Sequence, residues 1–113
     1  GKAFENWVFH ELSVHSKYSQ SFYELSYWRL SSGIEVDFIL GPGTVAVEAK
    51  GKSRITSGDM RGLVNLKKDF PEVKWLIIVC LEKRIRKTNE GIYVVPYQEF
   101  IRLLWDEKWT RNL

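Results

Sequence analysis

The sequence predicts a mixed α/β domain, in which one mixed β-sheet carries helices on both faces. Three observations lead to this fold class. Two segments, near the beginning and the end of the chain, space their apolar side chains as amphipathic helices do. Residues 34–50 form two strand patterns joined by Gly41-Pro42-Gly43. The run Trp75–Leu81 is apolar throughout, which is typical of a strand covered on both faces. The expected order of elements is α-β-β-β-α-β-β-α.

The chain begins with a predicted helix over residues 2–16. Its apolar stripe consists of Phe4, Trp7, Val8 and Leu12. The polar, short side chains of residues 13–21 predict that the helix gives way to a loop there. Residues 22–30 are rich in aromatic side chains and predict a strand, and residues 31–33 predict a turn.

A β-hairpin follows, with predicted strands Ile34–Leu40 and Thr44–Lys50. Side chains on a strand alternate between its faces. The pattern puts one apolar set on each strand: Val36, Phe38 and Leu40 on the first, and Val45, Val47 and Ala49 on the second. If these faces align, then Asp37, Glu48 and Lys50 converge on the opposite side. Charges on largely buried strands are costly to desolvate unless they pair or bind a ligand, so the hairpin is a candidate site.

The second half of the chain alternates loops with regular elements. Residues 51–57 predict a basic connection, and Ser57 or Asp59 is expected to cap a helix that ends near Phe70, before Pro71. Residues 83–91 predict a charged loop and residues 92–95 a short strand. Pro96 is then expected to open a last helix, with the apolar stripe Phe100, Ile101, Leu104 and Trp105.

Length and composition favour a single globular domain over residues 1–113, since the 113 residues are 44% hydrophobic and 14% aromatic. The net charge of +3 permits an anionic partner without predicting one. The only cysteine, Cys80, excludes an internal disulfide and suits a reducing compartment, so we expect a cytoplasmic location. No apolar run approaches the ~20 residues of a membrane span, so we expect no membrane partner. Because the chain opens with Gly1 beside a predicted helix, we expect an excised part of a longer protein.

The acidic residues follow a recognisable spacing. Asp37 and Glu48 are eleven positions apart, Lys50 stands two residues after Glu48, and Glu5 lies on the leading helix. This pattern resembles the PD-(D/E)xK nuclease superfamily, whose restriction-endonuclease-like core is α-β-β-β-α-β. In that superfamily an acid often comes from the first helix, an Asp from the second strand and (D/E)xK from the third. The resemblance covers about residues 1–81, although Val36 replaces the proline of the motif's name.

Three short segments resemble one family more closely, the carboxy-terminal domain of certain prokaryotic AAA+ ATPases. They are Lys2-Ala3-Phe4-Glu5-Asn6, Glu35-Val36-Asp37-Phe38 and Val47-Glu48-Ala49-Lys50. The resemblance implies that an amino-terminal ATPase domain is attached in cis. Because resolvases of the wider superfamily work as dimers, it also makes a homodimer a partner to consider.

The resemblance implies a metal-dependent endonuclease that hydrolyses phosphodiester bonds of DNA with Mg²⁺ or Mn²⁺. We expect the carboxylates of Asp37 and Glu48 to bind the ion together with the carbonyl of Ala49, because Mg²⁺ prefers hard oxygen ligands. Glu5 would bind a second ion or a water molecule on the first. Lys50 would orient or deprotonate the attacking water, or stabilise the developing charge.

Simpler interpretations stand beside these. On a solvent-facing hairpin, Asp37, Glu48 and Lys50 would form a salt bridge contributing under about 1 kcal/mol. Glu5 could have no catalytic role and simply be an acidic residue in the first helical turn, where it interacts favourably with the helix dipole. The domain as a whole could be an inactive nuclease-fold module that binds nucleic acid or a partner for the ATPase, or a purely structural interaction domain.

Two groups of cations could contact phosphates. Near the site are Lys52, Arg54 and Arg61, which we expect to contact the nucleic-acid backbone without reading its sequence. The run from Lys83 to Lys87 carries four cations in five residues and is either a phosphate-binding or a solvated loop.

Overall fold

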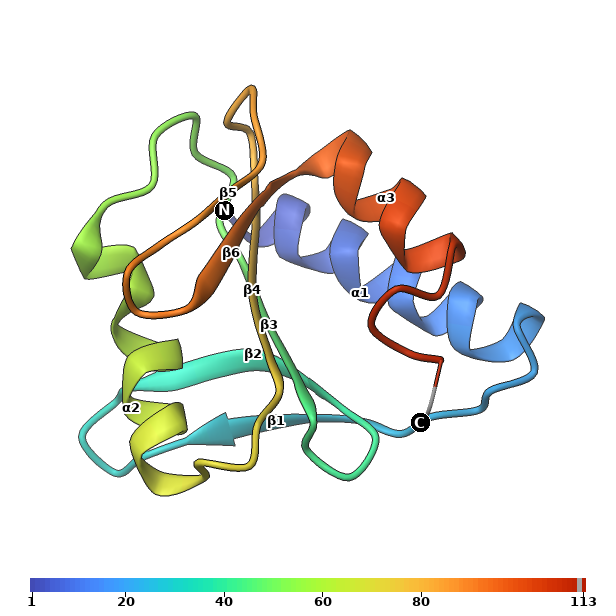
Figure 1. Ribbon diagram of the computed structural model, residues 1–113, viewed down its shortest axis with the longest axis horizontal. Coiled ribbons are helices and arrows are strands. Elements are labelled where there is room, and N and C mark those ends of the chain that lie inside the picture. The colour runs from blue at the N-terminus through green and yellow to red at the C-terminus, as the bar shows by residue number, and fades with distance from the viewer. Residues whose placement is uncertain (112) are drawn as a thin grey trace.

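The computed structural model describes residues 1–111 and 113, and its centre is a six-stranded sheet (Figure 1). The strand order is β1-β2-β3-β4-β6-β5. The first three strands pair antiparallel, β3, β4 and β6 are parallel, and β5 is antiparallel to β6. The predicted mixed sheet is therefore confirmed. The strands are β1 (Leu25–Arg29), β2 (Glu35–Leu40), β3 (Val45–Ala49), β4 (Trp75–Cys80), β5 (Arg86–Lys87) and β6 (Ile92–Pro96).

Three α-helices in the described part of the chain cover the sheet on both faces, as predicted. Helices α1 (Lys2–Tyr18) and α3 (Tyr97–Trp105) lie together on one face (Figure 1). Helix α2 (Arg61–Asp69), preceded by the 3₁₀ turn η1 (Ser57–Met60), packs on the other. Each helix buries the centre of its apolar stripe: Val8 and Leu12 of α1, Leu63 and Leu66 of α2, and Phe100 and Leu104 of α3. Trp105, predicted to belong to the stripe of α3, is instead 40% exposed at the end of that helix. No helix of this part of the chain is both long and apolar enough to cross a membrane.

Strand β4 lies inside the sheet, and all of its residues from Leu76 to Cys80 are buried. Ile77 and Val79 belong to the core under α1 and α3, whereas Leu76, Ile78 and Cys80 belong to the core under α2. This arrangement confirms that the apolar run is covered on both faces from Leu76 to Cys80, whereas Leu81, the end of the predicted run, is 50% exposed. Each large aliphatic side chain buried in this way stabilises the fold by about 1.5–3 kcal/mol.

The end of α1 corrects the prediction of a loop over residues 13–21, because the helix continues to Tyr18. Two of the polar residues there, His15 and Ser16, are buried and contact Tyr23. His15 Nδ1 lies 2.9 Å from the hydroxyl of Tyr23, and Ser16 Oγ donates to the carbonyl of Tyr23 at 3.0 Å. The strand β1 begins only at Leu25, since Phe22 has a left-handed φ of 49°.

Two further boundaries differ from the prediction. The cap before η1 is Thr56 rather than Ser57 or Asp59, and the carboxylate of Asp59 reaches back to accept the Thr56 N–H at 2.9 Å. The end of helix α2 at Asp69, with Phe70 as its C-cap, is as predicted. The charged loop of residues 83–91 contains the two-residue strand β5, which pairs with Val94 and Tyr93 of β6.

Candidate functional site

The predicted hairpin of β2 and β3 is regular only near its turn. There, Phe38 pairs with Val47, Ile39 with Ala46 and Leu40 with Val45. On the other side of β2, Ser26 of β1 pairs with Ile39, but Trp28 pairs with Val36. Tyr27 therefore faces both Asp37 and Phe38, which is the arrangement of a β-bulge. Such bulges bend a strand and redirect its side chains.

The bulge changes the face to which Val36 points. Phe38 and Leu40 pack in the core under α1 and α3, but Val36 packs in the core under α2. The prediction that these three residues share one face was therefore wrong for Val36, because the bulge inserts one residue into the alternation. On β3, where pairing is regular, Val45, Val47 and Ala49 share a face as predicted.

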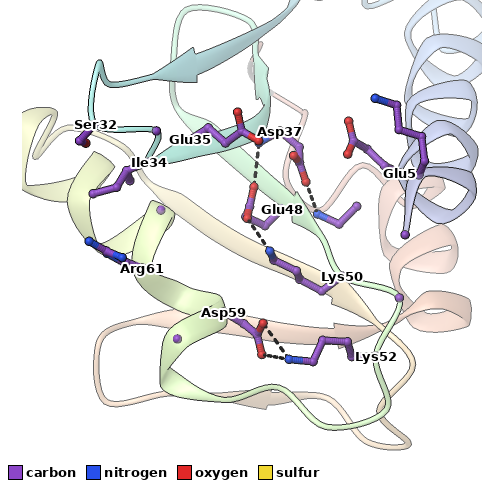
Figure 2. Close-up of a pocket in the computed structure, with 17 residues that line it drawn as sticks. Glu5, Ser32, Ile34, Glu35, Asp37, Glu48, Lys50, Lys52, Asp59 and Arg61 are labelled. Atoms are coloured by element: carbon purple, nitrogen blue, oxygen red, sulfur yellow. Dashed lines mark hydrogen bonds and ion pairs between the residues drawn. The ribbon is translucent and has the colours of Figure 1, made fainter.

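On the side of Phe38 that is away from the turn, side chains rather than backbone pairs join the two strands. The N–H of Asp37 donates to Glu48 Oε1 at 2.8 Å, and the N–H of Ala49 donates to Asp37 Oδ2 at 2.8 Å (Figure 2). Each carboxylate thus satisfies a backbone donor of the opposite strand. These crossed bonds hold the two carboxyl groups next to each other in fixed positions.

Glu48 is almost fully enclosed, with 4% of its surface exposed. Burial raises the pKa of its carboxyl to about 8, and the neighbouring Asp37 carboxylate acts in the same direction. The backbone N–H of Asp37 and the ammonium of Lys50 oppose this rise without cancelling it. A group so enclosed does not belong to a solvent-facing salt bridge, so that simpler interpretation does not describe Glu48.

Lys50 follows directly after β3 and stays beside the two carboxyl groups. Its Nζ lies 3.7 Å from Glu48 Oε2, and 35% of its side chain is exposed. Its backbone N–H donates to the carbonyl of Val79 at 2.9 Å, which ties this position to β4. The amine is therefore close to the acids and still accessible from solvent.

A pocket of about 610 Å³ opens over this end of the hairpin. Glu5 lies on its wall and extends from α1 toward Asp37 (Figure 2). The structure thus brings the four predicted catalytic residues and Ala49 around one pocket. The charged residues that line it are Lys2, Glu5, Glu35, Asp37, Glu48, Lys50, Lys52, Asp59 and Arg61.

The opposite wall of the pocket carries two of the three predicted backbone-contacting cations. Lys52 Nζ is bound by both carboxylate oxygens of Asp59, at 2.9 and 2.8 Å, and Arg61 stands at the start of α2. Arg54 is exposed and does not line the pocket. Lys52 therefore has an acidic partner, whereas Arg54 lies outside the hollow.

The loop between β3 and η1 is held by an ion pair between Glu82, which follows β4, and Arg86 of the edge strand β5. Glu82 Oε2 accepts the N–H of Ile55 at 2.7 Å, while Arg86 donates to the carbonyl of Ile55 at 3.3 Å. Arg86 also makes two hydrogen bonds to Glu82, both of 2.9 Å. We call this arrangement of Glu82, Arg86 and Ile55 the Ile55 clasp. It gives Arg86 a structural role that its place in the basic run did not reveal.

Sequence reasoning missed two residues that shape the pocket, Gly62 and Asp59. A Cβ on Gly62 would collide with the carbonyl oxygen of Glu35, so only glycine lets α2 approach β2 beside the bulge. The available signal was a glycine inside a helical pattern, which often has a packing reason. Asp59 was considered only as a cap, yet it also holds Lys52.

The donor chemistry of the pocket fits a hard divalent cation. Burial is the main cause of the raised pKa of Glu48, and repulsion by the adjacent Asp37 carboxylate adds to it. A bound divalent cation would relieve that repulsion. Among the described residues, no three His, Cys, Asp or Glu side chains lie close enough together to hold a metal ion. Asp37 and Glu48 would therefore need a further ligand, such as the carbonyl of Ala49 or a reoriented Glu5.

The fold and the pocket define a class: a mixed α/β domain whose acids and lysine gather where two antiparallel strands separate. Residues 1–100 match the model of a family described as a domain of unknown function, DUF4143. The chain belongs to this family. Searches of the curated proteins and of the solved structures gave no match.

Proposed function

We propose that this domain hydrolyses phosphodiester bonds of DNA in a divalent-metal-dependent reaction of the PD-(D/E)xK type. The observation that carries the proposal is the crossed pair of Asp37 and Glu48 with the Lys50 amine beside it. The element order α1-β1-β2-β3-α2-β4 supports it, because the restriction-endonuclease-like core has the same order.

The two carboxylates would hold the ion. Their positions are fixed by the backbone donors of Asp37 and Ala49, so little rearrangement is needed on binding. A bound Mg²⁺ or Mn²⁺ would supply Lewis acidity there, for activating water and for neutralising negative charge on the phosphate. The carbonyl of Ala49 is the proposed third ligand, and Glu5 of α1 is the proposed ligand for a second ion.

Lys50 would act on the attacking water or on the phosphate. In hydrolysis the oxygen of water attacks phosphorus, the bond from phosphorus to the leaving oxygen breaks, and a proton from water ends on that oxygen. The Lys50 ammonium lies at the pocket surface, where it can hold the attacking water or donate to a phosphoryl oxygen. Its exposure leaves room for both partners.

Cations on the facing wall would hold the nucleic-acid backbone. Lys52 and Arg61 line the same pocket as the acids, and exposed Arg54 could extend the contact along the strand. Contacts of this kind depend on salt concentration and carry no base preference.

The test is cleavage of labelled DNA with Mg²⁺ or Mn²⁺ by the wild type and by Asp37→Ala and Lys50→Ala. We expect both substitutions to abolish cleavage while circular dichroism and the melting temperature show a folded chain. Asp69→Ala and Lys68→Ala are matched controls, because both residues are exposed on α2 and outside the pocket. Activity that survives both site substitutions would exclude the assignment.

A second function also has an observation in its favour. Because Asp37 and Glu48 each accept a backbone N–H, they could serve the hairpin alone, in a non-catalytic module that binds nucleic acid or a partner for an attached ATPase. That function predicts DNA binding without metal dependence and no cleavage with any metal. The ATPase domain in cis and the homodimer remain predictions from the resemblance.

A further inference from the structure

A smaller hollow lies on the other side of Asp37. It has a volume of about 220 Å³ and is lined by Glu5, Tyr27, Arg29, Glu35, Val36 and Asp37. Three of these residues, Glu5, Glu35 and Asp37, also line the larger pocket. The two hollows therefore meet at the acids of the proposed catalytic site.

The smaller hollow contains an aromatic ring that the core does not use. Tyr27 is 68% exposed and stands on the edge strand β1, opposite the bulge at Asp37. The guanidinium carbon of Arg29 lies 5.7 Å from the centre of its ring. Arg29 is itself paired with Glu35, whose Oε2 accepts a hydrogen bond from Nε at 2.9 Å and lies 2.8 Å from Nη2 in the same ion pair. The ring is thus held at the mouth of the hollow with much of its surface open.

The charges of the two hollows select different parts of a nucleotide. In the smaller hollow, Glu5, Glu35 and Asp37 face a single cation, Arg29, that is already paired. A phosphate would be repelled there, whereas an uncharged base would not. The larger pocket adds Lys50, Lys52 and Arg61 to the acids. Lys52 is paired with Asp59, so Lys50 and Arg61 are the cations that would receive a phosphate there. The base is therefore the part that suits the hollow beside Tyr27.

We propose that this hollow receives an unpaired nucleobase stacked on Tyr27, next to the phosphate in the larger pocket, so that the domain acts on single-stranded DNA. The inference rests on the proposed function, since it concerns the same site. In a duplex the base is paired and stacked on its neighbours, and it would have to leave that stack to reach Tyr27. A single strand offers the base at no such cost, and aromatic stacking accepts every base.

Binding measurements test the proposal apart from cleavage. Fluorescence anisotropy would compare a labelled single strand and its duplex in the Lys50→Ala background with Mg²⁺ present. We expect the duplex to bind more weakly than the single strand by about tenfold, and Tyr27→Ala to weaken single-strand binding by about tenfold. Tyr27→Phe should retain tight binding because it keeps the ring. Tyr18→Ala should change nothing, because Tyr18 is 77% exposed but lies at the far end of α1, outside both hollows.

Photocrosslinking gives a direct readout of stacking. A single strand containing 5-iododeoxyuridine should label Tyr27 in the wild type, as mapped by mass spectrometry. Single-strand binding by Tyr27→Ala within twofold of the parent, equal binding of duplex, or labelling only at other residues would each overturn the proposal.

The outcomes also separate this inference from the proposed function. Single-strand binding that depends on Tyr27, in a wild type that never cleaves with any metal, would overturn hydrolysis and leave the base site standing. Metal-dependent cleavage that is indifferent to Tyr27 would overturn the base site and leave hydrolysis standing. The absence of any DNA binding would overturn both.

Discussion

The two ends of one hairpin differ in what holds them together. At the turn end, Phe38–Leu40 and Val45–Val47 pair by backbone, and all of these residues are buried except Ile39, which is half-buried. At the open end, the backbone donors of Asp37 and Ala49 are satisfied by carboxylates, and a pocket begins. Two strands of five and six residues thus combine a rigid anchor with a polar site. The regular backbone pairing at the turn end fixes the positions of the two strands. The carboxyl groups at the open end are held in place by that pairing and do not interrupt it.

The largest expected effect comes from Glu48→Gln at the open end. The amide keeps the shape and can still accept the Asp37 N–H, so the hairpin should persist. Loss of one metal-binding charge should slow cleavage by roughly a thousandfold, or about 4 kcal/mol of transition-state stabilisation. Single-turnover cleavage with Mg²⁺ measures this effect. A rate within tenfold of wild type would mean that the open end is not the reactive site.

The matching change at the turn end is Leu40→Ala. Leu40 is 1% exposed in the core under α1 and α3, so its truncation should lower the free energy of unfolding by about 2–5 kcal/mol. Urea denaturation measures the loss, with Leu40→Val as a milder variant. Cleavage per folded molecule should remain near the wild-type rate. A cleavage loss as large as that of Glu48→Gln would contradict the separation of the two ends.

A pH titration sharpens the comparison further. The pKa of Glu48 rises to about 8 in the folded chain from an ordinary value of 4.5, so the folded state holds a proton that the unfolded state releases. Stability must therefore fall as pH rises from about 4.5 to about 8. Without divalent cations, the free energy of unfolding of the wild type should drop relative to that of Glu48→Gln by on the order of 2–4 kcal/mol across this window.

Addition of Mg²⁺ at pH 8 should recover much of that loss in the wild type but not in Glu48→Gln, because a cation bound to the folded state stabilises it. Thermal melts at several pH values give both results. Parallel pH profiles for the two proteins would show that Glu48 does not carry the buried proton.

The smallest effect is expected at the facing wall, from Asp59→Ala. This substitution removes the partner of Lys52 and the acceptor of the Thr56 N–H, at a cost of about 1–2 kcal/mol of stability. It also frees the Lys52 ammonium, so single-strand DNA should bind somewhat more tightly at low salt. Chemical denaturation and anisotropy measure the two effects. Weaker DNA binding by a folded Asp59→Ala would show that Lys52 must be held in place to act.

Much of the fold could be predicted because its signals are local. The alternation on β3, the apolar run of β4 and the stripes of the helices each depend on neighbours in sequence. Predictions failed where partners are distant. Val36 changes face because of its pairing with β1, and the helix continues through His15 and Ser16, whose side chains contact Tyr23 from outside the helix.

In the candidate site, too, features that depend on local sequence were predicted, and features that depend on contacts between separate elements were not. Glu5, Asp37, Glu48 and Lys50 were predicted together because their spacing matches a known pattern, and the structure gathers them around one pocket. Gly62, the second role of Asp59 and the Ile55 clasp depend on packing between separate elements. No pattern in a single segment could have indicated them.

The Ile55 clasp has a consequence for how the mouth of the pocket can respond to a large ligand. Both main-chain groups of one residue are tied to side chains from beyond β4, on the other flank of the sheet. The rim that carries Lys52 cannot swing outward unless those ties break together. The Ile55 clasp therefore restrains this side of the entrance, and under the proposed function a DNA strand would enter an opening that is already formed.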